Sequence, residues 1–220
     1  MSAEHTAGAT SLRSAGVMLA FALAFTMMMA TTYRFTRPHI EAAREAEKMK
    51  LIDAVLPPGR YDNQLLDDVV ELGPTPALGL RQGGRVYRAR RGGADAALIV
   101  EATAPDGYGG RIELLVAVGA DDRLAGVRAT AHAETPGLGD YIDPRKDRNK
   151  KAPWIEQFRG RAAKPATVLA LRKDGGELDY RVGATISARA VAGAVARALG
   201  WTLSHDTRLY AAPAGSRYQP

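Results

Sequence analysis

An uncharged apolar segment near the amino terminus constrains this chain more than any other feature. The segment "AGVMLAFALAFTMMMATTY" runs from Ala15 to Tyr33 and is flanked by Arg13 and Arg34. At the helical rise per residue, a segment of this length spans about 28 Å, close to the thickness of the hydrocarbon core of a bilayer. A cleaved signal sequence is the alternative, but its apolar region is usually shorter and ends in a small-residue cleavage site. The segment therefore favours an uncleaved transmembrane anchor.

The charges around this anchor do not decide its orientation. More basic residues follow the segment than precede it, which by the positive-inside rule would place the main domain in the cytoplasm. Long domains, however, cross membranes largely regardless of such charges. Acidic residues are also interleaved with the basic ones after the anchor. Both orientations stay open on these grounds.

Composition excludes several kinds of chemistry. The 220 residues include no cysteine, so disulfides, thiolate-bound iron–sulfur clusters, cysteine-ligated zinc and thiol catalysis are ruled out. The four histidines are scattered, and we expect no metal site. The net charge of +6 is diffuse and no nucleic-acid-binding motif is present, so no nucleic-acid partner is expected. Any redox chemistry must therefore come from a bound organic cofactor or from a partner.

Hydrophobic periodicity predicts an α+β fold. Apolar residues at helical spacing after Arg37 predict an amphipathic stalk helix, which Pro57, Pro58 and Gly59 would stop. Short apolar or alternating runs separated by Gly- and Asp-rich turns predict an antiparallel sheet with helices packed against it. The four runs cover residues 85–90, 96–104, 111–119 and 124–133.

The carboxyl-terminal third predicts three further elements. "APWIEQFRG" predicts a short helix with buried aromatic residues, and "ATVLALRKDGGELDYRV" predicts a hairpin with Asp174 at its tip. "SARAVAGAVARALG" predicts a helix that ends at Gly200, after which structural signals are weak. The predicted parts are thus a tail at 1–14, an anchor at 15–33, a stalk helix and linker at 34–84, a domain at 85–203 and a tail at 204–220.

The first stretch that suggests chemistry is "AHAETPGLGDYI". Pro136 fixes φ, and glycines on both sides of Leu138 permit backbone conformations closed to other residues. Such a loop could press a flat surface against a planar ring. An ordinary turn after a strand is the alternative, and Glu134 without a second carboxylate is a weak sign of acid–base catalysis.

The second stretch is "DYRVGATISARAV". Ser187 is a candidate N-cap for the helix that follows, which would place Thr185 just before a helix amino terminus. Free backbone N–H groups and the helix dipole favour a phosphate there, and Gly183 and Ala184 remove steric bulk in front of it. The threonine hydroxyl could hydrogen-bond a phosphate or be esterified to one. An ordinary turn with Thr185 as a capping residue is the alternative.

Four stretches together carry a resemblance to a known family. "GYGGRI", "HAETPGLGD", "WIEQF" and "DYRVGATIS", in this order after one membrane span, resemble the FMN-binding domain family and, within it, the G subunits of Rnf-type ion-translocating electron transport complexes. The resemblance runs from Ala15 to about Gly200. It implies that a separate flavin transferase takes FMN from FAD and attaches it covalently, through its phosphate, to Thr185. The chain departs from the attachment motif at Val182, where Ser or Thr is usual.

The resemblance also implies the residues of the site and the role of the chain. The residues around the flavin would be Asp179, Gly183, Ala184 and Ser187 beside Thr185, with Glu134, Thr135, Gly137 and Leu138 from the loop. No side chain is expected to act as a catalyst, because the flavin carries the electrons.

The implied function is an electron relay in an Rnf-type complex that couples ferredoxin–NAD electron transfer to Na⁺ or H⁺ movement. The implied partners are the other subunits of that complex and the flavin transferase. The implied location is the bacterial inner membrane, with a single span and the flavin domain on the periplasmic side. The alternatives are the C subunit of the Na⁺-pumping quinone reductase and a membrane-anchored scaffold protein without a cofactor.

Overall fold

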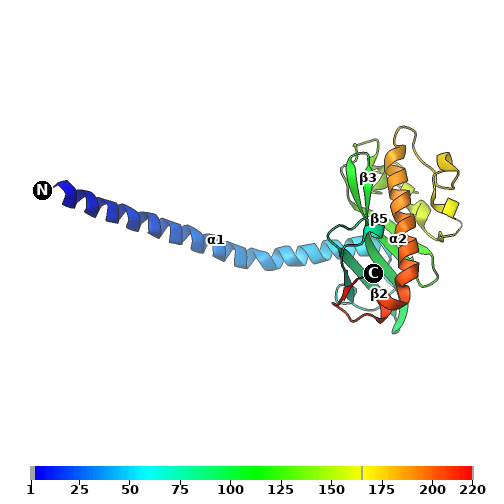
Figure 1. Cartoon of the computed structure of the whole chain (residues 1–220), viewed down its shortest axis with the longest axis horizontal. Coiled ribbons are helices and arrows are strands. Elements are labelled where there is room, and N and C mark those ends of the chain that lie inside the picture. The colour runs from blue at the N-terminus through cyan, green and yellow to red at the C-terminus, as the bar shows by residue number, and fades with distance from the viewer. Residues whose placement is uncertain (1–2, 165, 220) are drawn as a thin grey trace. The chain divides into compact units, whose positions relative to one another are not determined.

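The computed structural model describes residues 3–164 and 166–219 of the chain. The chain divides into two units, residues 1–47 and residues 48–220 (Figure 1).

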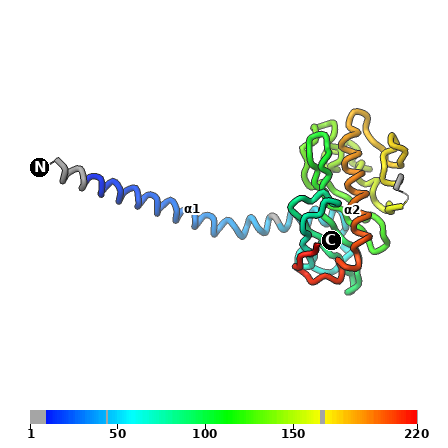
Figure 2. Tube along the Cα trace, viewed as in Figure 1, coloured from blue at the N-terminus to red at the C-terminus, as the bar shows by residue number. Residues whose placement is uncertain are grey.

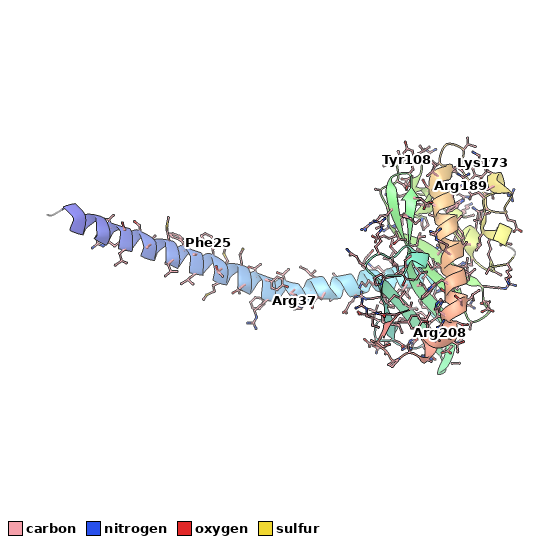
Figure 3. All side chains as sticks on the ribbon, in the orientation of Figure 1. Phe25, Arg37, Tyr108, Lys173, Arg189 and Arg208 are labelled. Carbon is pink, nitrogen blue, oxygen red and sulfur yellow. The ribbon has the colours of Figure 1, made fainter. Side chains whose placement is uncertain are left out.

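The first unit is a long helix. Helix α1 (Ala3–Val55) includes the whole apolar segment, and its last turns from Lys48 onward belong to the second unit. The large apolar side chains between Val17 and Met29 are exposed, Phe25 among them (Figure 3). Within the residues the structure describes, α1 is the one helix long and apolar enough to cross a membrane. A single apolar helix of this kind fits membrane association.

The predicted anchor and the predicted stalk helix are continuous in the structure. The structure has one helix through both, with Pro38 inside it. Proline removes one backbone donor, but the residues after it favour helix, and Arg37 donates to Glu41 one turn later at 2.7 Å. The predicted stop is confirmed, because α1 ends at Val55 ahead of the Pro57–Pro58 pair.

The second unit is built on a six-stranded sheet with the order β5-β4-β3-β2-β1-β6. All neighbours pair antiparallel except β6, which pairs parallel with β1, so the sheet is mixed. The four predicted strands are confirmed as β2 to β5. The strands are β1 (Val69–Leu72), β2 (Gly84–Arg91), β3 (Ala94–Gly107), β4 (Gly110–Gly119), β5 (Leu124–Ala131) and β6 (Arg217–Tyr218).

Both faces of the sheet are covered. Successive side chains along a strand point to opposite faces, so one strand can contribute apolar side chains to a core on each side. On β4, Leu114 and Val116 point into the core beneath helix α2 (Thr185–Ala211), whereas Leu115 and Ala117 point into a second, smaller core. The end of α1 covers that second core with Ile52, Val55 and Leu56. The long helix α2 lies along the opposite face of the sheet, over the larger core, as Figure 1 shows.

Short 3₁₀ helices occupy the connections between these elements. They are Pro76–Leu78, Asp140–Ile142, Trp154–Phe158, Ala166–Leu169 and Arg172–Asp174. The third confirms the predicted short helix with Trp154, Ile155 and Phe158 buried. The predicted hairpin over 166–182 is wrong. Only an isolated parallel bridge joins Leu171 to Leu178, and 3₁₀ turns replace the two strands.

The carboxyl terminus is more ordered than the weak signals after Gly200 indicate. Helix α2 continues past Gly200 to Ala211, because the buried residues Trp201, Thr202 and Leu209 extend its inner face. Strand β6 then returns to the edge of the sheet and pairs with β1 (Figure 2). At the other end, Leu65 and the β1 residues Val70 and Leu72 are buried as well. The packed unit therefore extends beyond the predicted domain range of 85–203 in both directions.

Candidate functional site

Three segments that are distant in sequence meet at the start of α2. They are the tip of the β3–β4 hairpin (107–110), the loop after β5 (132–139) and the first turn of α2. A Cβ at Gly109 would lie 2.1 Å from the carbonyl oxygen of Ala133, so the hairpin tip touches the loop. The loop in turn contacts the helix through a hydrogen bond from Ser187 to Glu134. In Figure 3, Tyr108 of the tip and Arg189 of α2 lie at the same end of the second unit.

Helix α2 begins without a side-chain cap. Its N-cap is Ala184, which has no capping side chain, and its first turn contains no acidic residue. Gly183 precedes it with φ of +86°, a conformation that favours glycine. Thr185 is the first helical residue and is partly exposed. The prediction that Ser187 caps this helix is wrong, because Ser187 lies inside the first turn and its hydroxyl donates to Glu134 instead.

The loop after β5 is a compact turn with an exposed apolar side chain. The N–H groups of Leu138 and Gly139 both donate to the carbonyl of Thr135 at 3.1 Å. Gly137 adopts φ of +75°, and its N–H donates to the Asp140 carboxylate at 2.9 Å. Leu138 is 45% exposed. Its Cδ1 lies 3.8 Å from where a Cβ on Gly183 would be, so the loop faces the residues just before α2.

Exposed apolar side chains surround the start of α2. Val182 is 89% exposed, and Ile186, Leu138 and Tyr108 are also largely exposed. Water-exposed large apolar side chains gathered at one place are typical of a surface that binds an apolar ligand or partner. Polar N–H groups at the helix start and apolar side chains beside them together suit a ligand with an anionic end and a flat apolar body.

A set of buried groups holds the segment before α2 in place. The Tyr141 hydroxyl donates to the Ala184 carbonyl at 3.2 Å and accepts the Arg181 N–H at 3.3 Å. Arg181 also pairs with the buried carboxylate of Asp147 and lies over the Tyr141 ring. Burial raises the pKa of Tyr141, although Arg181 opposes the shift. No local pattern signals these contacts among Tyr141, Asp147, Arg181 and Ala184, because each contact that reaches the segment before α2 spans more than 30 residues.

Asp179 supports the segment from its backbone. Its carbonyl accepts the Trp154 indole N–H at 2.5 Å, and its N–H donates to Gln157 at 2.8 Å. Its exposed carboxylate pairs with Arg172 at 3.1 Å. The buried helix of the WIEQF stretch is therefore joined directly to the start of the DYRVGATIS stretch.

The loop begins with a histidine, His132, whose side chain lies beside the buried carboxylate of Asp143. Burial lowers the pKa of His132, and Lys146 lowers it further. Burial of Asp143 would raise the pKa of its carboxyl, but hydrogen bonds from Arg145 outweigh this and hold that pKa below its usual value. The Nδ1 atom of His132 accepts the Glu134 N–H at 3.2 Å, which requires an unprotonated Nδ1.

Comparisons with known proteins place the chain in a family. The sequence model of the FMN-binding domain matches residues 107–200, a range that begins at the hairpin tip and includes the loop and the start of α2. The model of the RnfG N-terminal region matches residues 1–55. The G subunit of the ion-translocating oxidoreductase complex of Pseudomonas aeruginosa is 44% identical over 203 residues, 91% of this chain and 92% of the relative.

The chain belongs to the family of G subunits of ion-translocating oxidoreductase complexes.

Two further G subunits support this placement. That of Aliivibrio fischeri is 36% identical over 207 residues, 93% of this chain and 96% of the relative. That of Salmonella typhi is 41% identical over 191 residues, 86% of this chain and 89% of the relative. The resemblance to G subunits is thus confirmed, and it is favoured over the alternative of a quinone reductase C subunit. Membership in this family makes the chain an electron-transport subunit with an FMN-binding domain, which works among partner subunits.

The residues at the start of α2 fit FMN. The uncapped N–H groups of a 27-residue helix suit its phosphate, and Gly183 has only Leu138 within 4 Å of its missing side chain, which leaves room for close approach. The exposed apolar side chains of Leu138, Val182 and Ile186 suit the ring system. Of the predicted site residues, Glu134 and Ser187 are buried and bonded to each other, whereas Thr135, Gly137, Leu138 and Thr185 are accessible.

Proposed function

We propose that this chain is a covalent flavoprotein subunit in which FMN is esterified through its phosphate to Thr185. The observation that carries the proposal is the position of Thr185 as the first residue of an uncapped helix, partly exposed, directly after Gly183 with its positive φ and Ala184. The hydroxyl therefore lies where N–H groups and the helix dipole stabilise a phosphate. When bound, FMN supplies reversible electron transfer, and the chain supplies placement.

The attachment requires a separate flavin transferase and FAD. The oxygen of the Thr185 hydroxyl bonds to the phosphorus on the flavin side of the FAD pyrophosphate, and the P–O bond to the adenylate half breaks. AMP leaves, and the hydroxyl proton passes to it or to solvent. No electron changes hands in this step. A covalent link matters because a dissociable cofactor outside the cytoplasm would be lost by dilution.

In the complex, we place the chain as an electron relay between flavins. The complex would couple ferredoxin–NAD electron transfer to the movement of Na⁺ or H⁺ across the bacterial inner membrane, with the flavin domain in the periplasm. The absence of cysteine from the sequence offers a simple check on this orientation. A single cysteine in place of the exposed Lys173 should react with an impermeant maleimide in intact cells, and protection until the membrane is permeabilised would refute a periplasmic domain.

Replacing the acceptor hydroxyl tests the proposal directly. Thr185→Val, produced together with the flavin transferase, should fold but carry no covalent flavin. Thr185→Ser keeps a hydroxyl and should retain flavin. Thr207→Val, at the far end of the same helix, is the matched control and should be loaded like the wild type. Flavin fluorescence of the denatured band measures loading, and the mass of the tryptic peptide 182–189 should exceed its sequence mass by FMN less one water.

Two outcomes would contradict the proposal. Fluorescence that survives unfolding in Thr185→Val would move the attachment to another residue. A wild-type protein of unmodified mass, produced with an active transferase, would favour a scaffold protein or a non-covalent FMN carrier.

A further inference from the structure

The Glu134 carboxylate lies at the point where the three segments of the site meet. The residue is only 3% exposed, and each carboxylate oxygen accepts a hydrogen bond from a different segment. Oε1 accepts the N–H of Gly109 from the hairpin tip at 3.1 Å, and Oε2 accepts the hydroxyl of Ser187 from α2 at 2.5 Å. One side chain thus joins the GYGG, ETPGLG and GATIS stretches.

The backbone around this carboxylate is packed too closely for side chains. A Cβ on Gly107 would lie 2.6 Å from Oε1 of Glu134. A Cβ on Gly139 would lie 2.8 Å from Oε2 and 2.7 Å from the Ser187 oxygen. Distances below 3.0 Å are essentially never occupied by a real Cβ, so both glycines are needed for the segments to approach Glu134. The backbone of the three segments is therefore shaped to fit around this carboxylate.

The hydrogen bond to Ser187 sets the direction in which Thr185 points. Residues two apart on an α-helix are separated by about 200° around its axis, so these two side chains lie on nearly opposite sides. Ser187 is 1% exposed and faces the loop, whereas Thr185 is partly exposed. Fixing Ser187 on the inner side therefore fixes Thr185 on the outer side, in the first turn, where a helix otherwise frays most readily.

We infer that Glu134 is a positioning residue: through Ser187 it holds the first turn of α2 so that the Thr185 hydroxyl is presented for FMN transfer. This inference rests on the proposed function. It replaces the expectation that Glu134 contacts the flavin, because both of its oxygens are already engaged by the protein. Glu134 does not itself touch the reacting atoms.

Kinetics of FMN transfer to the full-length apoprotein in detergent, with purified transferase and FAD, test the inference. Glu134→Ala should lower kcat for transfer about 10- to 100-fold, since displacement of a reacting group by about 1 Å costs this much, while KM for FAD stays unchanged. Ser187→Ala should have a similar effect. The double variant should be no slower than either single variant, because the two residues act as a unit.

The conservative variant separates positioning from charge. In Glu134→Gln the amide oxygen can accept the Gly109 N–H while the amide nitrogen donates to the Ser187 oxygen. Transfer should therefore recover to within about threefold of the wild type, a difference worth less than about 1 kcal/mol in the barrier. Glu113→Ala, a surface glutamate on β4, is the matched control and should transfer at the wild-type rate. Thermal unfolding of each apoprotein shows that it is folded.

The outcomes separate the inference from the proposal beneath it. If Glu134→Ala fails to fold, Ser187→Ala still decides, because it removes one hydroxyl and keeps the carboxylate. Wild-type rates in a folded Glu134→Ala or in Ser187→Ala would overturn the inference while leaving attachment at Thr185 intact. Failure of the wild-type protein to accept FMN would instead overturn the covalent attachment, and the inference with it.

Discussion

The two ends of helix α2 are completed in opposite ways. At the carboxyl end, Arg88 is 3% exposed and donates through Nη1 to the carbonyl oxygens of Leu209 and Tyr210, at 3.1 and 3.2 Å, and of Ala212. The guanidinium also pairs with Asp68, which lies just ahead of strand β1. At the amino end, none of the described side chains caps the first turn. The carboxyl end is capped by a buried guanidinium, and the first turn at the amino end is not capped by any described side chain.

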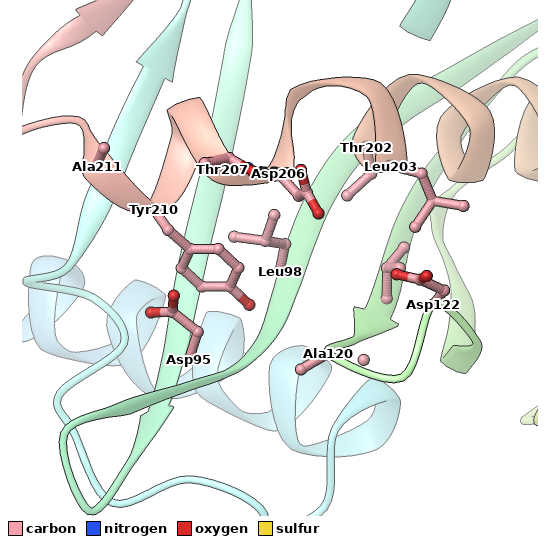
Figure 4. A pocket seen from close by; sticks show the side chains of 12 residues that line it. Asp95, Leu98, Ala120, Asp122, Thr202, Leu203, Asp206, Thr207, Tyr210 and Ala211 are labelled. Atoms are coloured by element: carbon pink, nitrogen blue, oxygen red, sulfur yellow. Dashed lines mark hydrogen bonds between the residues drawn. The ribbon is translucent and has the colours of Figure 1, made fainter.

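The surroundings of the two ends also differ. Beneath the carboxyl half of α2 lies a groove of about 470 Å³, lined by Leu98, Tyr210 and three aspartates (Figure 4). Within the described part of the chain, Asp122 and Asp206 form no ion pair, and Asp95 pairs with Arg90. At the amino end, the backbone around Glu134 is packed too closely for side chains at Gly107 and Gly139. The contrast is between a lined groove at one end and tightly packed backbone at the other.

Removing the carboxyl-end cap should have the largest effect on stability. Arg88→Met leaves carbonyl groups and the Asp68 carboxylate without their main partner, and breaking a buried ion pair from one side costs about 3 kcal/mol or more. Arg189→Met, at the amino end, breaks an exposed pair with Asp174 and should leave the unfolding free energy almost unchanged, because solvent screens such pairs. Chemical denaturation measures both values.

The same pair of variants tests whether the two ends are independent. Folded Arg88→Met should still accept covalent FMN, with hydrogen exchange faster only in the last turns of α2. Loss of flavin loading with an unchanged unfolding free energy would mean that the carboxyl-end cap serves the site as well as the fold.

Glycine substitutions at the hairpin tip and within α2 should have effects of opposite sign on stability. Gly109→Ala forces a Cβ to within 2.1 Å of the Ala133 carbonyl, and overpacking against backbone costs about 1–3 kcal/mol and displaces the hairpin tip. Gly200→Ala places a methyl group where nothing lies within 4 Å, on the exposed side of α2, and should stabilise the protein by about 0.5–1 kcal/mol. Thermal unfolding of the two variants checks the signs. Equal changes in thermal stability in the two variants would mean that the close packing at the hairpin tip does not contribute to stability.

The sequence predicted the elements better than the contacts between them. Strands β2 to β5 follow from apolar alternation and turn residues, both of which are local. Helix α2 was predicted too short because Gly200 is typical of a helix end, although buried Trp201 and Leu209 carry the helix further. Arg88 lies in a predicted strand, but its burial beneath α2 depends on residues about 120 positions away.

The candidate site shows the same difference between local motifs and distant contacts. The residues Gly183, Thr185 and Leu138 were found from local motifs, and the structure brings them together. The hydrogen bonds of Glu134 cannot be predicted from the sequence, because its partners Gly109 and Ser187 lie 25 and 53 residues away. A motif can therefore mark a residue without showing its partners, since sequence shows which residues occur together but not which atoms meet.

The smallest expected effect is a pH dependence that belongs to the amino end alone. Because burial and Lys146 lower the pKa of His132, the folded state disfavours protonation relative to the unfolded state. His132 therefore contributes stability that is fully present above the unfolded pKa of about 6.5 and is lost as pH falls through the lower folded pKa. Protonation also removes the acceptor for the Glu134 N–H, so the loop should loosen first. Asp143, whose pKa is also lowered, acts only at more acidic pH.

His132→Asn should remove this dependence, because the asparagine oxygen can take the place of Nδ1 as an acceptor but does not titrate. Unfolding free energies at about pH 7.5 and about pH 5, on either side of the histidine range, should differ less in the variant than in the wild type. After correction for the pH dependence of intrinsic exchange, amide protection should fall on acidification in the wild-type loop at 132–139 and in the first turn of α2, but not in the turns that Arg88 caps. An equal response at both ends of α2 would show that His132 acts on the whole fold. The contrast between the uncapped amino end and the carboxyl end capped by Arg88 would then have no support from stability.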